Sequence, residues 1–231
     1  MRRTKVIVGL LLVLMVGCGG TTPPTVAPTD ENTPLRPLAE IGRGDYDGAT
    51  VNVLAPVLRR SNGQVLVPAL SVVGAEPTPL LDTPASAIVL GGDPLIGLTD
   101  AGATAYGVVN VRGTVQVGAD GVRQIQPTSS KVLVPTSITL AALQRDSSVY
   151  QGQVVAISGT LIIKADAALL VEAVGSGGVP SATAVQIKIV QPFNDAALVA
   201  ALPNTSGTIR YGEATLTGIW QGNTLVVFWG E

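Results

Sequence analysis

The chain has 231 residues, among them 14 Lys or Arg, 16 Asp or Glu, one Cys and no His. Without histidine it cannot build a Ser-His-Asp or Cys-His catalytic group, or a metal site made of His and Cys side chains. The acidic excess provides no broad electrostatic attraction to nucleic acid or to anionic lipid, so we expect no nucleic-acid partner.

The first segment of the chain has the pattern of an export signal. Arg2, Arg3 and Lys5 make a positively charged start, and residues 6–16 are almost wholly apolar. An apolar run of this length is typical of a signal peptide, because a transmembrane helix needs about 20 residues. The sequence therefore predicts export from the cytoplasm.

The apolar run ends in Leu-Met-Val-Gly-Cys at residues 14–18, which resembles the bacterial lipobox. The resemblance implies cleavage before Cys18, a diacylglycerol on its thiol, and a lipid anchor on the membrane outside the cytoplasm. Gly19 after the cysteine implies the outer membrane if the cell has one. Cys18 is the only cysteine, so an internal disulfide is excluded as its role. The alternative is an ordinary signal peptide, or a short anchor helix, that contains a cysteine.

The residues after Cys18 are mostly Gly, Thr, Pro, Asp, Glu and Asn up to position 37, and such stretches stay extended. Removal of residues 1–17 leaves 11 basic and 16 acidic residues, a net charge of −5. The predicted organisation is a signal peptide at 1–17, a lipidated cysteine and tether at 18–37, a domain at 38–128, a linker at 129–137, and a second domain at 138–231.

The two predicted domains are copies of one pattern. Leu38–Arg43 aligns with Leu140–Arg145, and Tyr46-Asp47-Gly48 aligns with Tyr150-Gln151-Gly152. The strands that follow align without a gap, and Tyr106-Gly107 matches Tyr211-Gly212. All four tyrosines of the chain thus occupy paired positions, which indicates an internal duplication.

Each copy shows the same order of expected elements, a short helix, three strands, a helical segment and a final pair of strands. Asn62-Gly63 in the first copy is a strong hairpin signal. In the second copy, Asn194 is the expected cap of a helix that continues to Leu202 and ends at Pro203. The expected strands are 51–58, 64–73 and 87–90 in the first copy and 154–163, 168–174 and 184–190 in the second, each set followed by a hairpin.

This order is that of the OB-fold, a five-stranded Greek-key barrel. The copies also resemble OB-type domains of exported bacterial proteins, in which a short helix precedes Tyr/Asp-Gly and an alternating strand such as Val155–Gly159. The predicted fold class is all-β with minor α, with two tandem five-stranded OB-like Greek-key barrels after the signal peptide and tether; a small β-sandwich is the alternative. Ala55-Pro56 replaces Gly159-Thr160 in the first copy and predicts a bulge or an edge there.

Carboxylate pairs are the remaining catalytic candidates, Asp45 with Asp47 and Asp93 with Asp100. They lie in Gly- and Pro-rich loop sequence, where Asp normally forms turns or caps helices. Residues 44–48 suggest a calcium loop but lack the further oxygen ligands and the distal Glu of an EF-hand. No motif favours a Ser–Lys pair either, so the sequence predicts no enzyme, no metal and no cofactor.

Trp220 and Trp229 have no aromatic counterparts in the first copy, where Val115 matches Trp220. In the final hairpin Trp220 is expected opposite Leu225, with Leu216, Val227 and Trp229 on the same face. This candidate face suits a glycan, a small ligand or a partner protein. The alternative is that both indoles fill a barrel end or the contact between the copies.

The strands expected to bind ligands in an OB-fold are aliphatic here and lack the aromatic platforms of single-strand binders. The predicted function is therefore a membrane-anchored extracytoplasmic lipoprotein that acts as a non-catalytic binding or scaffold module of the cell envelope, with an envelope protein as its partner. A glycan- or small-ligand-binding lipoprotein that uses Trp220 and Trp229 is the alternative.

Overall fold

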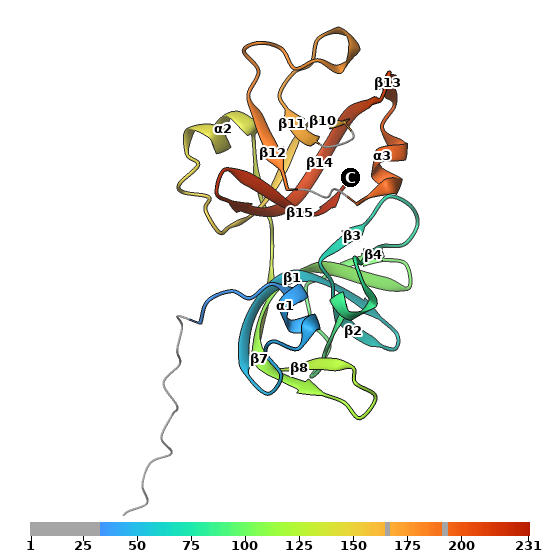
Figure 1. Ribbon diagram of the computed structural model, residues 1–231, viewed down its shortest axis with the longest axis vertical. Helices are drawn as coiled ribbons and strands as arrows, with labels where there is room; N and C mark the ends of the chain where they lie inside the picture. The colour runs from blue at the N-terminus through green and yellow to red at the C-terminus, as the bar shows by residue number, and fades with distance from the viewer. Residues whose placement is uncertain (1–32, 165–166, 191–193) are drawn as a thin grey trace, which may run out of the picture. The chain divides into compact units, whose positions relative to one another are not determined.

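The computed structural model describes residues 33–164, 167–190 and 194–231, and Thr33–Glu231 forms one compact unit (Figure 1). The predictions on the signal peptide and on Cys18 lie outside the described residues. Residues 33–37, the end of the predicted tether, attach to the first strand of the unit. The Asn52 side chain donates to the Thr33 carbonyl, and the Arg36 N–H donates to the Asn52 carbonyl.

The first copy forms a closed barrel of five strands, as predicted. The ring order is β1 (Thr50–Arg60), β2 (Gly63–Leu66), β5 (Ile88–Leu90), β8 (Arg123–Leu133) and β7 (Thr104–Val117). Pairing of β1 with β7 closes the ring, and β5 with β8 is its parallel pair. This is the strand order of a Greek-key OB barrel.

Five short elements accompany this barrel. They are the lead-in helix α1 (Leu38–Arg43), the hairpin of β3 (Ala69–Ser71) with β4 (Thr78–Leu80), the 3-10 turn η1 (Pro84–Ser86), and the strand β6 (Thr99–Ala101), which pairs with β7.

The second copy repeats the ring. Its strands are β10 (Val154–Lys164), β11 (Ala167–Val171), β12 (Gln186–Ile189), β15 (Thr224–Gly230) and β14 (Ile209–Gln221). Here β14 pairs with β10 to close the ring, and β12 with β15 is the parallel pair. The all-β fold class and the duplication are thus both present in the structure.

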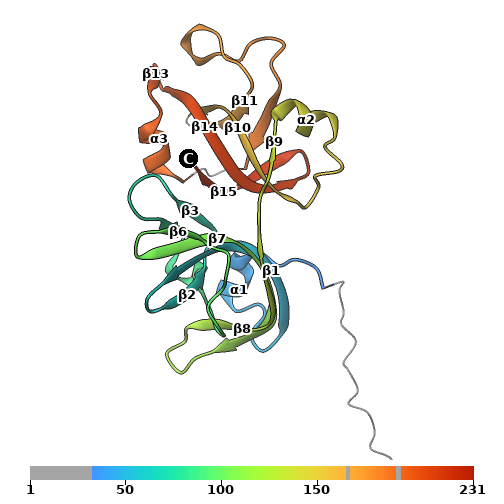
Figure 2. The same ribbon diagram turned by 180° about the vertical axis from the view of Figure 1, so that it is seen from behind.

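The second barrel also has short accompanying elements. They are β9 (Thr136–Ile138), α2 (Leu140–Arg145), the 3-10 turn η2 (Ser176–Gly178), α3 (Ala196–Ala201) and β13 (Asn204–Ser206). Seen from behind in Figure 2, β9 runs alongside β10, with which it pairs in parallel.

Equivalent hydrogen bonds show how closely the copies correspond. The Gly48 N–H donates to the Val115 carbonyl at 2.9 Å, and the Gly152 N–H donates to the Trp220 carbonyl at 2.8 Å. Val115 and Trp220 are therefore equivalent positions, as the alignment predicted, although one is aliphatic and the other aromatic.

Three expectations about local structure were wrong in whole or in part. The helix after the third strand exists only in the second copy, because Gly92 and Gly97 of the first copy have positive φ, and β6 takes its place. The cap of α3 is Asp195 and not Asn194, since the Asp195 carboxylate accepts from the Leu198 N–H. Pro56 causes no bulge, because β1 pairs with β7 continuously on both sides of it, but it does lie at an edge, since the pairing of β1 with β2 begins only at Val57.

A β-bulge occurs at the same place in both barrels. In β15 one extra residue, Phe228, lies between the partners of Thr217 and Gly218, and in β8 Thr128 lies between the partners of Arg112 and Gly113. A Cβ on either glycine would overlap a backbone carbonyl of the bulged strand. Glycine at these two positions therefore lets the strands approach at the bulge.

The buried side chains form one cluster inside each barrel and a third cluster that contains residues of both. Leu58, Leu70 and Val108 of the first copy join Ile219, Phe228 and Trp229 of the second in this third cluster. The two barrels therefore share apolar core, which is the physical basis of their single compact unit.

Candidate functional site

A cavity of about 210 Å³ lies where the β3–β4 hairpin meets β15 and the start of α3. Most of its wall is apolar, and its polar groups lie together on one side. The apolar lining includes Leu70, Leu80, Val190, Val226, Phe228 and Trp229, and the polar side chains are Asp82, Asn194 and Asp195. A concave apolar site with a few convergent polar groups is the usual form of a small-molecule site.

The bulge in β15 explains why Trp229 lies at this cavity. Trp220 pairs with Leu225 and Gly218 pairs with Val227, so the residues up to Val227 follow the predicted alternation. Phe228 is the extra residue, and Trp229 then pairs with Thr217. Because one inserted residue reverses which face later side chains occupy, Trp229 points out of the barrel and not inward with Trp220.

The predicted common face of the two tryptophans is therefore corrected. Trp220 is 3% exposed and packs inside the second barrel together with Leu216 and Val227. Its indole N–H donates to the Ser147 hydroxyl at 3.1 Å. Trp229 is 7% exposed and belongs to the cluster shared by the barrels. The two indoles do not form one exposed surface.

Tyr106 of the first barrel holds the Trp229 ring in an edge-to-face contact. The ring centroids are 5.5 Å apart and the ring planes make an angle of 84°. Burial, together with the negative charge of Glu231, raises the pKa of Tyr106, so the phenol is neutral at physiological pH. One wall of the cavity is thus fixed by an aromatic pair that joins the two copies.

Asp195 is the buried polar group of the cavity, with a relative exposure of 3%. Its Oδ1 accepts from the Ser71 hydroxyl of β3 at 2.9 Å and from the Leu198 N–H of α3 at 3.0 Å. Among the described residues, no donor reaches its Oδ2, which is buried as well. The carboxylate is therefore held in place by both barrels but is only half satisfied.

A second acidic residue lies at the rim. The Asn194 amide donates to the exposed Asp82 carboxylate at 2.9 Å, which joins the α3 side of the cavity to the segment after β4. The polar side of the cavity consequently offers carboxylate oxygens, and its electrostatic character is negative.

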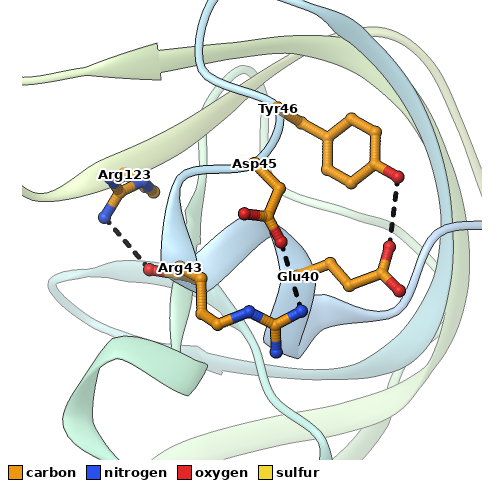
Figure 3. A network of polar contacts seen from close by, with 6 residues as sticks. Glu40, Arg43, Asp45, Tyr46 and Arg123 are labelled. Carbon is orange, nitrogen blue, oxygen red and sulfur yellow. Dashed lines mark hydrogen bonds and ion pairs between the residues drawn. The ribbon is translucent and has the colours of Figure 1, made fainter.

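Asp45 and Asp47, the acidic residues of the first candidate catalytic pair and of the possible calcium loop, do not line this cavity. Arg43 forms an ion pair with Asp45 at 3.1 Å, and Arg123 binds both oxygens of Asp47 at 2.7 and 3.0 Å. Figure 3 shows Arg43 with Asp45, and Tyr46 donating to Glu40. The Arg123 hydrogen bond holds the pKa of Asp47 below its usual value. The carboxylate oxygens that would have to bind a calcium ion are thus already paired with Arg43 and Arg123.

In the other pair considered, Asp93 with Asp100, the contacts differ between the two residues. Asp100 lies 3.6 Å from the Arg59 guanidinium, and the Asp93 carbonyl accepts from the Gln64 side chain. In the described part of the chain, no three acidic or cysteine side chains gather as a metal-binding group.

In comparisons with known proteins, no protein-family model matches the chain, and no curated protein is significantly similar to it. Within the described ranges, no helix has the length and apolar character needed to cross a membrane.

The sequence predicts Trp229 as part of a face and a helix cap at Asn194, beside Asp195, but it does not predict the cavity that Trp229 and Asp195 both line. Ser71 and Asp195 are 124 positions apart, so no local pattern connects them. The one available signal was that Trp229 has no counterpart in the first copy.

Proposed function

We propose that the protein is a membrane-anchored, extracytoplasmic lipoprotein that acts as a non-catalytic binding module, and that the cavity between the β3–β4 hairpin and β15 is its binding site. The anchor rests on the export pattern and on Cys18 in a lipobox-like sequence. The absence of histidine from the whole chain supports binding over catalysis.

The observation that carries the binding function is the cavity itself. Its wall is mostly apolar, and its size exceeds that of an apolar cavity of about 150 Å³ that is known to hold benzene. The walls formed by Leu70, Phe228 and Trp229 hold water only weakly. Binding of an apolar ligand that displaces this water is therefore favourable.

A substitution that fills the cavity with a larger side chain tests whether the cavity binds a ligand. We expect the unchanged protein to bind toluene and Val226→Phe to abolish this binding, because the added ring occupies the space. Chemical-shift changes of backbone amides during a toluene titration measure this binding. Val149→Phe, at a side chain that is 62% exposed, is the matched control and should bind as the unchanged protein does. Equal shift changes in both variants would contradict the proposed site.

The anchor is tested at the thiol. We expect Cys18→Ser to lose all label from a radioactive or clickable fatty acid and to move from the membrane to the soluble fraction, because the serine cannot carry the thioether-linked lipid. Thr21→Ser, a change in the same segment that leaves the thiol intact, serves as control. Undiminished label on the Cys18→Ser chain would overturn the anchor.

The glycan alternative needs an open aromatic surface made by Trp220 and Trp229. Both indoles are buried, and only Trp229 reaches the cavity. We therefore favour a small ligand enclosed by the cavity over a sugar stacked on an open face, while an envelope protein as partner stays a proposal of its own.

A further inference from the structure

We propose that the cavity selects a small apolar amine, bound as its ammonium ion, with the ammonium on Asp195 and the apolar part against β15. This inference rests on the proposed function, that the cavity is a binding site, and it names the chemical class of the ligand.

The buried carboxylate is the first reason. A buried polar atom without a hydrogen-bond partner is costly, and a buried charge more so, which is why nearly all such groups in folded proteins have partners. Asp195 uses Oδ1 for two donors and leaves Oδ2 without one in the described part of the chain. A ligand that brings a positively charged N–H donor supplies the missing partner and also the opposite charge.

The position of this oxygen is the second reason. Ser71 and the Leu198 N–H hold the carboxylate from two sides, so its orientation is set before any ligand arrives. A preorganised acceptor loses little entropy on binding. Asp195 lines the cavity but its Oδ2 is itself buried, so a donor reaches this oxygen only if neighbouring side chains move.

The other side chains of the wall determine the chemical character of the rest of the ligand. Leu70, Leu80 and Val226 offer no hydrogen bonds from their side chains, so a polyhydroxylated ligand would lose its hydration without compensation. Phe228 and Trp229 also line the cavity, and aromatic rings attract a nearby cation. An anion is disfavoured by Asp195 and by Asp82 at the rim.

The same groups argue against a bare metal ion. Calcium takes about six to eight oxygen ligands and magnesium about six, many of them carboxylates or carbonyls. This wall presents two carboxylate side chains amid aliphatic and aromatic groups, and Asp82 already accepts from Asn194. An organic cation matches both parts of the wall, whereas a metal ion matches only one.

Size restricts the ligand to roughly one ring and a short chain. A volume of about 210 Å³ exceeds by a modest margin the roughly 150 Å³ that accommodates benzene. Benzylamine is therefore a suitable probe. Benzyl alcohol and benzoate have nearly the same shape but carry a neutral and a negative group, so the three together isolate the effect of charge.

The test is calorimetric titration of the full chain with each probe at neutral pH, in nanodiscs if the chain is acylated, with empty nanodiscs as reference. We expect benzylamine to bind at least about tenfold more tightly than benzyl alcohol, and benzoate not to bind, because a charge-assisted hydrogen bond is worth this much. This comparison uses the unchanged protein, so it holds even if a variant fails to fold.

Asp195→Asn then assigns the selectivity to one residue. The amide keeps an acceptor oxygen for Ser71 and Leu198 but presents an N–H₂ in place of Oδ2, so we expect benzylamine to lose about tenfold in affinity while benzyl alcohol stays within about twofold. Glu172→Gln removes one charge from an exposed side chain and should leave all three affinities unchanged.

Each outcome separates the inference from the proposed function. Similar binding of the amine and the alcohol, both lost in Val226→Phe, would overturn the ammonium site and leave the cavity as a binding site. Binding of no probe at all would overturn both. Amine selectivity that survives Asp195→Asn would place the cation elsewhere and contradict the role of Asp195.

Discussion

Replacement of Trp229 by alanine is expected to lower the free energy of unfolding by about 3–5 kcal/mol, the largest effect of any substitution considered for this protein. The indole is 7% exposed, lies in the apolar cluster shared by the two barrels, and stacks edge to face on Tyr106. Its removal leaves a void between two rigid sheets that cannot close around it. Denaturant unfolding followed by circular dichroism measures the change.

The matched control for this prediction is Ile96→Ala. Ile96 is 90% exposed, so its truncation removes little buried surface and should change the unfolding free energy by less than about 0.5 kcal/mol. A loss at Trp229 no larger than the loss at Ile96 would mean that the shared cluster does not stabilise the unit.

Gly218→Ala is expected to destabilise the second barrel by about 3 kcal/mol, because the added methyl group overlaps the Val226 carbonyl beside the bulge. Both the glycine and the carbonyl belong to paired strands of a closed ring, so neither can move without breaking ladder hydrogen bonds. Thermal unfolding by calorimetry gives the change in stability. Gly113→Ala, at the equivalent bulge of the first barrel, should have an effect of similar size.

Gly175→Ala provides the control for a glycine substitution in the same barrel. Its φ is −86°, and an added Cβ would meet only the Val179 carbonyl at an ordinary contact distance of 3.7 Å. We expect it to be neutral or slightly stabilising, since alanine restricts the unfolded chain. A Gly218→Ala barrel as stable as the Gly175→Ala barrel would show that the bulge tolerates a side chain.

Trp229 and the bulge opposite Gly218 also shape the ligand site. The bulge opposite Gly218 turns Trp229 outward, and Trp229 then lines the same cavity as Asp195. A substitution at Gly218 should therefore reduce ligand binding as well as stability, whereas Asp195→Asn should affect amine binding far more than neutral-probe binding.

Local patterns in the sequence were sufficient for much of the fold. A short helix precedes the first long strand of each copy, as predicted, at Leu38–Arg43 and Leu140–Arg145, and Asn223 with Gly222 forms the last turn with positive φ at both residues. These elements depend on interactions between neighbours along the chain, such as capping, turn geometry and alternation, which are visible in a short window. The duplication made it possible to predict the OB-like strand order as well as the single elements, because the elements assigned in one copy supported those assigned in the other.

The candidate site could not be obtained in the same way. The alternation of β15 was predicted correctly up to Val227, and the bulge at Phe228 then reversed it for Trp229, because the bulge depends on how β14 and β15 pair and not on the composition of β15. The helix cap at Asp195 was assigned one residue early, and its hydrogen bond from Ser71 joins β3 of the first copy to the N-terminus of α3 in the second.

The sequence by itself determined the two-copy all-β architecture, through periodicity, turn residues and repetition, and it predicted the anchor at Cys18. Only the tertiary structure decided where the aromatic residues point and that a half-satisfied carboxylate borders an apolar cavity. The physical reason is that strand order follows from local alternation and turns, while a cavity is defined by the contact of surfaces far apart in the chain, here β3, α3 and the outward face of β15.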